Sequence, residues 1–203
     1  MFFKTLYWLA LAWSTSLTSA FETVEDAASI ARTLMTSTGV GTMATLYPND
    51  HPYLAGEPFA LQEYYSSCHT NGSLTLIFMP ISRHSQNILH SRNHSASITV
   101  WSSPPAASQA RVSLMGKVHV FPDGTGGENS IRECYIKSHP DAKRWLPDNE
   151  HGPHTALWAR FDPHTIYFVG GFGDEHYIGS IPLPLYQETN PTISVTGRLN
   201  VQL

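Results

Sequence analysis

Residues 79–87 read MPISRHSQN and follow an apolar run, SLTLIFM, at 73–79. Ser, Arg and His are residue types that bind phosphate, and here they lie where a predicted strand gives way to a short predicted helix. A helix N-terminus presents unpaired N–H groups to an anion, and Ser82 occupies its N-cap position. Arg83 would add a planar guanidinium and His84 a further donor. The same stretch also fits an ordinary polar helix start, and the spacing alone supports the two interpretations equally.

The composition is that of a globular protein with one domain. The chain has 203 residues, of which 41% are hydrophobic and 11% aromatic, enough to form a core. Charged residues make up only 14%, and the formal net charge is −4. Because the chain has no excess of basic residues, we expect no nucleic-acid partner and no membrane partner.

The first twenty residues have the pattern of a signal peptide. Lys4 precedes the apolar run LYWLALAW at 6–13, and small residues lead to a predicted cleavage site after Ala20. Eight apolar residues are too few to cross a bilayer as a helix. We therefore expect a product of the secretory pathway, either secreted or lumenal.

Two cysteines and two glycosylation sequons agree with that compartment. Cys68 and Cys134 are the only cysteines in the chain, and we expect them to form a disulfide; two separate buried thiols are the alternative. Asn71 and Asn93 begin sequons, whereas Asn190 precedes a proline and is excluded. Asn71 lies in a predicted Asn-Gly turn and should be glycosylated more readily than Asn93.

Short strands linked by turns dominate the rest of the chain, with a few helices between them. This pattern predicts a mostly β protein built as a closed or nearly closed barrel with peripheral helices. The domain should cover 21–188, and 189–203 should be a polar C-terminal tail without a partner. Gly116 is expected to mark a β-bulge, and Asp162-Pro163 a tight turn. Strands are expected at 40–47, 58–65, 73–79, 96–101, 111–121, 155–162 and 165–171, and helices at 24–36, after Ser82, and at 128–138.

Several other motifs do not have the pattern of a functional site. GGFGDEHYIG at 170–179 lacks the third glycine of a dinucleotide loop and is followed by prolines rather than a helix. His90 and His94, and His151 and His154, have spacings that metal ligands can use, but neither pair has a third ligand nearby in the sequence. There is no G-x-S-x-G nucleophile elbow, and bridged cysteines cannot act as nucleophiles. We therefore predict no metal site and no catalytic residue.

Five stretches in a fixed order carry a family resemblance. A strand, then Ser-Arg-Lys/His, then a helix with Asn-Leu/Ile, then a strand resembles the flavin mononucleotide (FMN) split barrels related to pyridoxamine phosphate oxidase. More specifically, the chain resembles a fungal-type member of the CREG-like family of secreted glycoproteins. The stretches are GEPFALQEYYSSC, SRHSQNI, ARVSLMGKV, CYIKSHPDAKRWLP and IYFVGGFGDEHYIGSIP.

The resemblance implies a six-stranded split β-barrel with peripheral helices, built as a homodimer with the ligand cleft at the dimer interface. In flavin-binding relatives the Ser-Arg-Lys stretch binds the phosphate of FMN. The residues carried over are Ser82, Arg83 and His84, and Asn87 would support the loop.

Two departures from the flavin-binding pattern weaken an enzymatic interpretation. Those oxidases carry an Arg where this chain has Glu57 and Pro58, and a Thr that touches the flavin where this chain has Phe78. CREG proteins as a group are regarded as having lost oxidase activity. The resemblance therefore favours a secreted, dimeric, non-catalytic glycoprotein acting through protein contacts, in which a pocket for FMN or phosphate can persist. The alternative is an FMN-dependent oxidoreductase of a lumenal or secondary-metabolite pathway.

Overall fold

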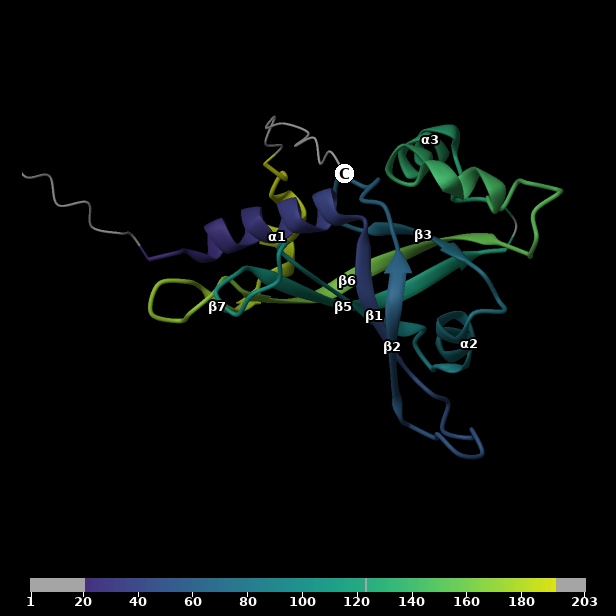
Figure 1. Cartoon of the computed structure of the whole chain (residues 1–203), viewed down its shortest axis with the longest axis horizontal. Helices are drawn as coiled ribbons and strands as arrows, with labels where there is room; N and C mark the ends of the chain where they lie inside the picture. Colours follow the sequence, from purple (N-terminus) through teal and green to yellow (C-terminus); the bar gives the residue numbers. More distant parts are fainter. Residues whose placement is uncertain (1–20, 123, 193–203) are drawn as a thin grey trace, which may run out of the picture.

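One antiparallel β-sheet that curls around an apolar interior forms the body of the protein, with helices on its flanks (Figure 1). The computed structural model describes residues 21–122 and 124–192; the predicted signal peptide at 1–20 and the tail residues 193–203 lie outside the described ranges. The strands are β1 (Val40–Leu46), β2 (Pro58–Tyr64), β3 (Leu74–Phe78), β4 (Ser95–Trp101), β5 (Arg111–Phe121), β6 (Leu157–Val169) and β7 (Ile178–Ile181). The helices are α1 (Val24–Thr38), α2 (Arg83–His90), α3 (Asn129–Ser138), the 3-10 helix η1 (Pro140–Arg144) and α4 (Leu183–Glu188).

The strand order explains why the barrel is split. Six strands follow one another in the order β2-β1-β4-β5-β6-β3, and the short β7 pairs with β6 off this path. β2 and β3 are therefore the two ends of the curled sheet, and an isolated bridge between Ser66 and Thr75 joins their neighbourhoods. The predicted mostly β split barrel with peripheral helices is confirmed, and β7 adds a seventh strand to its six.

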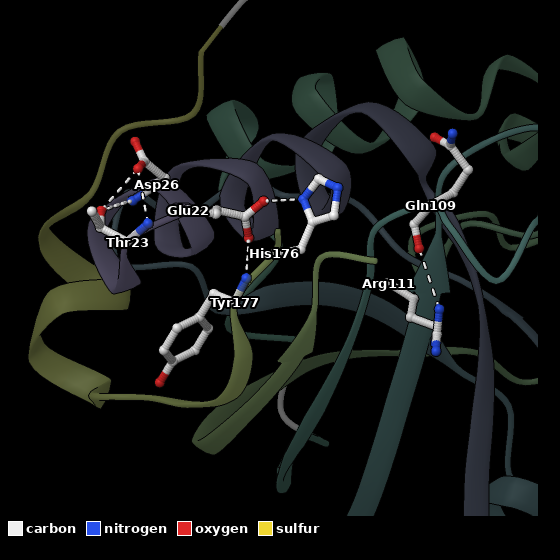
Figure 2. A network of polar contacts seen from close by, with 7 residues as sticks. All are labelled: Glu22, Thr23, Asp26, Gln109, Arg111, His176 and Tyr177. Atoms are coloured by element: carbon white, nitrogen blue, oxygen red, sulfur yellow. Dashed lines mark hydrogen bonds and ion pairs between the residues drawn. The ribbon is translucent and has the colours of Figure 1, made fainter. Parts of the chain in front are cut away.

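Helix α1 begins and ends at the residues that its sequence indicates. The Thr23 hydroxyl accepts from the Asp26 N–H at 3.2 Å, and the Asp26 carboxylate accepts from the Thr23 N–H at 3.0 Å, which completes a capping box (Figure 2). Gly39 ends the helix in the left-handed conformation. Just before the cap, Glu22 accepts from Tyr177 N and contacts His176 Nδ1 at 2.9 Å, so the start of α1 is tied to the turn before β7 (Figure 2).

The predicted turn at Asp162-Pro163 is wrong, because both residues lie inside the single long strand β6. Pro163 pairs with Gly116, where the register of β5 shifts after Met115. That shift is the predicted bulge, and it lets a residue without an N–H sit in an interior ladder. A Cβ at Gly116 would collide with the Asp162 carbonyl oxygen, so glycine is required there.

The end of the domain also differs from expectation, because α4 forms although two prolines flank its first residue. Pro182 is the N-cap and Pro184 lies in the first turn, where a missing N–H is tolerated. The described start of the tail has partners: the Thr189 carbonyl accepts from Arg32 Nε at 3.0 Å, and Thr192 N donates to Thr33 Oγ1 at 2.9 Å. Residues 189–192 therefore contact α1, which their sequence does not indicate.

Strand β3 is buried on both faces because two apolar clusters meet across it. Leu74, Leu76 and Phe78 face the main core, which fills the barrel and extends beneath α1 and α4. Ile77 faces a smaller cluster beneath α3 and η1, made with Tyr135, Ala142, Leu146, Ala156 and Trp158. The strand that borders the gap between β2 and β3 on the β3 side is therefore packed on both of its faces.

Candidate functional site

Ser82 occupies the N-cap of α2, as predicted, and its hydroxyl is engaged within the helix. Ser82 Oγ accepts from Ser85 N at 3.2 Å and donates to Ser85 Oγ at 2.9 Å. The side chain therefore satisfies one of the four N–H groups that a helix start leaves unpaired. The positive end of the helix dipole lies at this point.

His84 and Asn87 point in the opposite direction, into the contact between α2 and β1. Both are buried, and both meet the hydroxyl of Thr45: His84 Nδ1 lies 3.1 Å from it, and Asn87 Nδ2 donates to it at 3.1 Å. Because the Thr45 hydroxyl accepts a hydrogen bond from Asn87, it can donate its own hydrogen to His84 Nδ1. This buried chain of hydrogen bonds positions α2 on the barrel and leaves neither side chain facing a surface ligand.

The environment of His84 favours the neutral form of its ring. Burial lowers the pKa of His84 below its usual value, and the backbone of Leu61 acts weakly in the opposite direction. Its ring also packs against Phe59, with 4.9 Å between the ring centroids. A neutral, buried imidazole offers no positive charge to a phosphate.

Arg83 is the one residue of the predicted group that presents a charge to solvent. Its guanidinium carbon lies 5.3 Å from the centroid of the Tyr47 ring, at the start of the connection between β1 and β2. Within residues 21–122 and 124–192 the guanidinium has no hydrogen bond or ion pair. The structure thus brings Ser82 and Arg83 together at the start of α2 and separates them from His84 and Asn87.

A cleft of about 240 Å³ opens beside Ser82, in the split of the barrel. Glu63 and Tyr64 of β2 form one wall, and the end of β3 forms another. Tyr135 of α3 and Trp145, just after η1, cover it. The complete lining is Glu63, Tyr64, Ile77, Met79, Ser82, Tyr135 and Trp145.

Glu63 is an unusual carboxyl because it is partly buried without a cationic partner. Desolvation raises the pKa of Glu63 to about 7, opposed only by a hydrogen bond from the Tyr64 N–H at 3.1 Å. The pKa of the Tyr135 phenol is raised as well, first by burial and then by the negative charges of Glu63 and Asp141. The cleft is therefore aromatic, and its charged groups are acidic.

The predicted disulfide is present and holds one wall of this cleft. Cys68 and Cys134 are bonded, with 5.9 Å between their Cα atoms. Cys134 precedes Tyr135 on α3, while Cys68 follows the bridge that joins the two ends of the sheet. The covalent link therefore attaches α3 to the segment between β2 and β3 and places Tyr135 over Glu63.

The chain matches the family model described as "CREG, beta-barrel" over residues 22–188. The chain belongs to the CREG family. Three stretches of the CREG resemblance meet in the cleft: GEPFALQEYYSSC supplies Glu63 and Tyr64, SRHSQNI supplies Ser82, and CYIKSHPDAKRWLP supplies Tyr135 and Trp145.

Solved structures share the barrel of this CREG chain. A heme-binding protein from Mycobacterium smegmatis is 25% identical, with a TM-score of 0.63, and the match covers 81% of this chain and 61% of that one. A protein of unknown function from Agrobacterium tumefaciens is 19% identical, with a TM-score of 0.59 and the same coverage. The CREG chain thus spans about three fifths of the length of each. A search of curated proteins found no significant match.

Other predicted residues of the CREG chain lie away from the cleft. Asn71 and Asn93 are both exposed in turns, and the Asn71 side-chain oxygen accepts from Ser73 N at 3.1 Å. The described ranges contain no group of three His, Cys, Asp or Glu side chains arranged to hold a metal ion. They also contain no helix long and apolar enough to cross a membrane.

Sequence reasoning missed Glu63, Tyr135 and Trp145 as cleft residues, although all three lie in stretches that carry the CREG resemblance. Their sequence neighbours give no sign that strand β2 and helix α3 meet. The available signal was the pair of cysteines, because a link from Cys68 to Cys134 places residue 135 near the end of β2.

Proposed function

We propose that the protein is a secreted, dimeric, non-catalytic glycoprotein of the CREG family, with an anion site at the start of α2 for the phosphate of FMN or a related ligand. The observation that carries the anion site is the exposed, unpaired guanidinium of Arg83 beside the N-terminus of α2. The signal-like segment, the disulfide and the two exposed sequons support passage through the secretory pathway.

The fit to FMN is partial within one chain. Arg83 and the first turn of α2 suit a phosphate, but His84 and Asn87 are engaged with Thr45. The cleft beside Ser82, at about 240 Å³, lies below the usual range of about 300–1,000 Å³ for ligand pockets. Its carboxyl, Glu63, would also repel a phosphate. We therefore assign the phosphate to Arg83, and any site for the flavin ring would need surface from a second chain.

Arg83→Ala is expected to weaken the binding of FMN about tenfold or more, since one charge-assisted contact is worth roughly 1.5–3 kcal/mol. Fluorescence titration of wild type and variant measures the loss. Riboflavin has the ring without the phosphate, so its binding should be nearly unchanged. Arg92→Ala, beyond the other end of the same helix, is the matched control for charge and should bind FMN like wild type.

Ser82→Ala separates capping from ligand binding in the same experiment. Because the Ser82 hydroxyl caps α2, we expect a loss of about 1 kcal/mol of stability and a smaller change in FMN affinity than Arg83→Ala causes. Hemin is the comparison ligand, because the Mycobacterium smegmatis relative is described as heme-binding. Hemin binding without FMN binding would reject the phosphate site, and stoichiometric flavin in protein purified from its native host would favour the oxidoreductase alternative.

The dimer is proposed to form through the outward face of β1, β4 and β5. This face carries a hollow of about 340 Å³, lined mainly by apolar groups of Ala44, Leu46, Pro58 and Met115. The Leu46 side chain is 59% exposed at its rim. In the described part of the chain no helix covers this hollow, whereas α2 packs on the opposite face of β1.

Leu46→Glu should therefore weaken self-association by at least about tenfold, because a carboxylate would be desolvated in the interface. Light scattering across a concentration series measures the change. Leu89→Glu replaces a leucine of similar exposure on α2 and should leave the dimer intact. A wild-type monomer at micromolar concentration would overturn the proposal.

A further inference from the structure

The cleft in the barrel split has the composition of a site for a positively charged ligand, whereas the Arg83 site beside it suits an anion. Three aromatic side chains surround it: Tyr64, Tyr135 and Trp145. Aromatic faces attract cations through the ring quadrupole, and the attraction strengthens when water is excluded. Met79 adds a polarisable sulfur to the same wall.

Glu63 is the carboxylate among the residues that line the cleft. The Glu63 carboxylate accepts a hydrogen bond from the Tyr64 N–H, and no Lys, Arg or His in the described ranges forms an ion pair with it. Tyr64 and Tyr135 line the cleft with Glu63, the His139 ring packs against both tyrosines, and the charge of Asp141 acts on Tyr135. His139 is held by the Tyr65 carbonyl, 2.8 Å from its Nε2.

We propose that this cleft binds a small organic cation, an alkylated ammonium group, with its charge against Glu63 and its methyl groups against Tyr64, Tyr135 and Trp145. Its volume of about 240 Å³ suits a head group rather than a drug-sized molecule. Aromatic faces attract the positive charge of a ligand but do not neutralise it, whereas the Glu63 carboxylate does. The proposal does not depend on the anion site, because no lining residue except Ser82 belongs to the start of α2.

The pH dependence of binding has a defined sign. A cation prefers the ionised form of Glu63, and the pKa of that carboxyl in the free protein is about 7. Affinity should therefore be full above this pH and fall as the carboxyl is protonated below it. Between pH 8 and pH 6 the ionised fraction drops about tenfold, and the association constant of choline should drop by the same factor.

Calorimetric titration of the full secreted chain with choline tests this proposal. The neutral isostere 3,3-dimethylbutan-1-ol has the same shape without the charge and should bind at least about tenfold more weakly at pH 8. Glu63→Gln should lose both the affinity and its pH dependence. Glu57→Gln removes an exposed carboxylate just before the same strand and should bind like wild type.

Melting curves show that the variants are folded and supply a second readout. Glu63→Gln should melt no lower than wild type at pH 8, because it removes a desolvated charge. Choline should raise the melting temperature of wild type at pH 8 more than at pH 6. Equal binding of choline and its neutral isostere, or unchanged choline affinity in Glu63→Gln, would overturn the proposal.

Discussion

Replacing Cys68 and Cys134 together by serine is expected to lower the free energy of unfolding by about 4 kcal/mol. The bond closes a loop of 66 residues, and the chain-entropy model assigns a loss of this size to opening such a loop in the unfolded state. Urea denaturation of the double variant and of wild type measures the difference. The slope of the transition should also increase, because the unlinked chain exposes more surface.

Wild type treated with reductant is the control for that experiment. If the linkage rather than the new side chains matters, reduced wild type and the double variant should unfold at the same urea concentration. An unchanged midpoint in both would show that the bond adds nothing to stability. The cleft supplies a local readout: without the bond Tyr135 is no longer tied over Glu63, so choline affinity should fall even in urea-free buffer.

Arg32→Met should cost about 3 kcal/mol of stability, although Arg32 takes no part in either proposed site. Its side chain is only 2% exposed. Its Nε donates to the Thr189 carbonyl at 3.0 Å, its Nη2 to the Thr70 carbonyl at 2.7 Å, and its guanidinium lies over the Tyr186 ring. Methionine has similar length but no donor, so two partly buried carbonyls lose their partners at about 1–3 kcal/mol each.

Arg32→Lys retains the charge but lacks the planar guanidinium that reaches both carbonyls. Its free energy of unfolding should therefore lie between those of wild type and Arg32→Met. Arg92→Met, at an exposed position, should change stability by no more than about 0.5 kcal/mol. Urea denaturation of the three variants ranks them. Equal stability of Arg32→Met and wild type would show that solvent replaces the arginine at both carbonyls.

Local signals in the sequence were enough to predict most elements of the barrel. The start and the end of α1 could be predicted because a capping box and a left-handed glycine act within a few residues. The residues are Thr23 and Asp26 at the start and Gly39 at the end. The errors at β6 and α4 both involve proline. Pro163 lies in a strand because a bulge in the pairing of β5 with β6 accommodates it, and that pairing is not visible from the local sequence.

The candidate site was harder to predict because its residues divide between two faces. In α2 the apolar Leu89 is 46% exposed, whereas the polar His84 and Asn87 are buried with Ile88. Polar side chains that are buried against Thr45 give no apolar signal in the sequence. Glu63 looks like an ordinary alternating residue of β2, and its burial in a cleft with Tyr135 of α3 and Trp145 is not visible from the local sequence.

The position of β3 in the chain has a consequence for biosynthesis. β3 is made between β2 and β4, yet its ladder partner is β6, roughly 80 residues further along the chain. Until that partner leaves the ribosome, the segment LTLIF has neither a neighbouring strand nor a cluster to cover its two apolar faces. Such a segment is a natural recognition site for chaperones and a hazard for aggregation. The β3 segment of the nascent chain therefore stays unpaired and uncovered until nearly the whole domain has been synthesised.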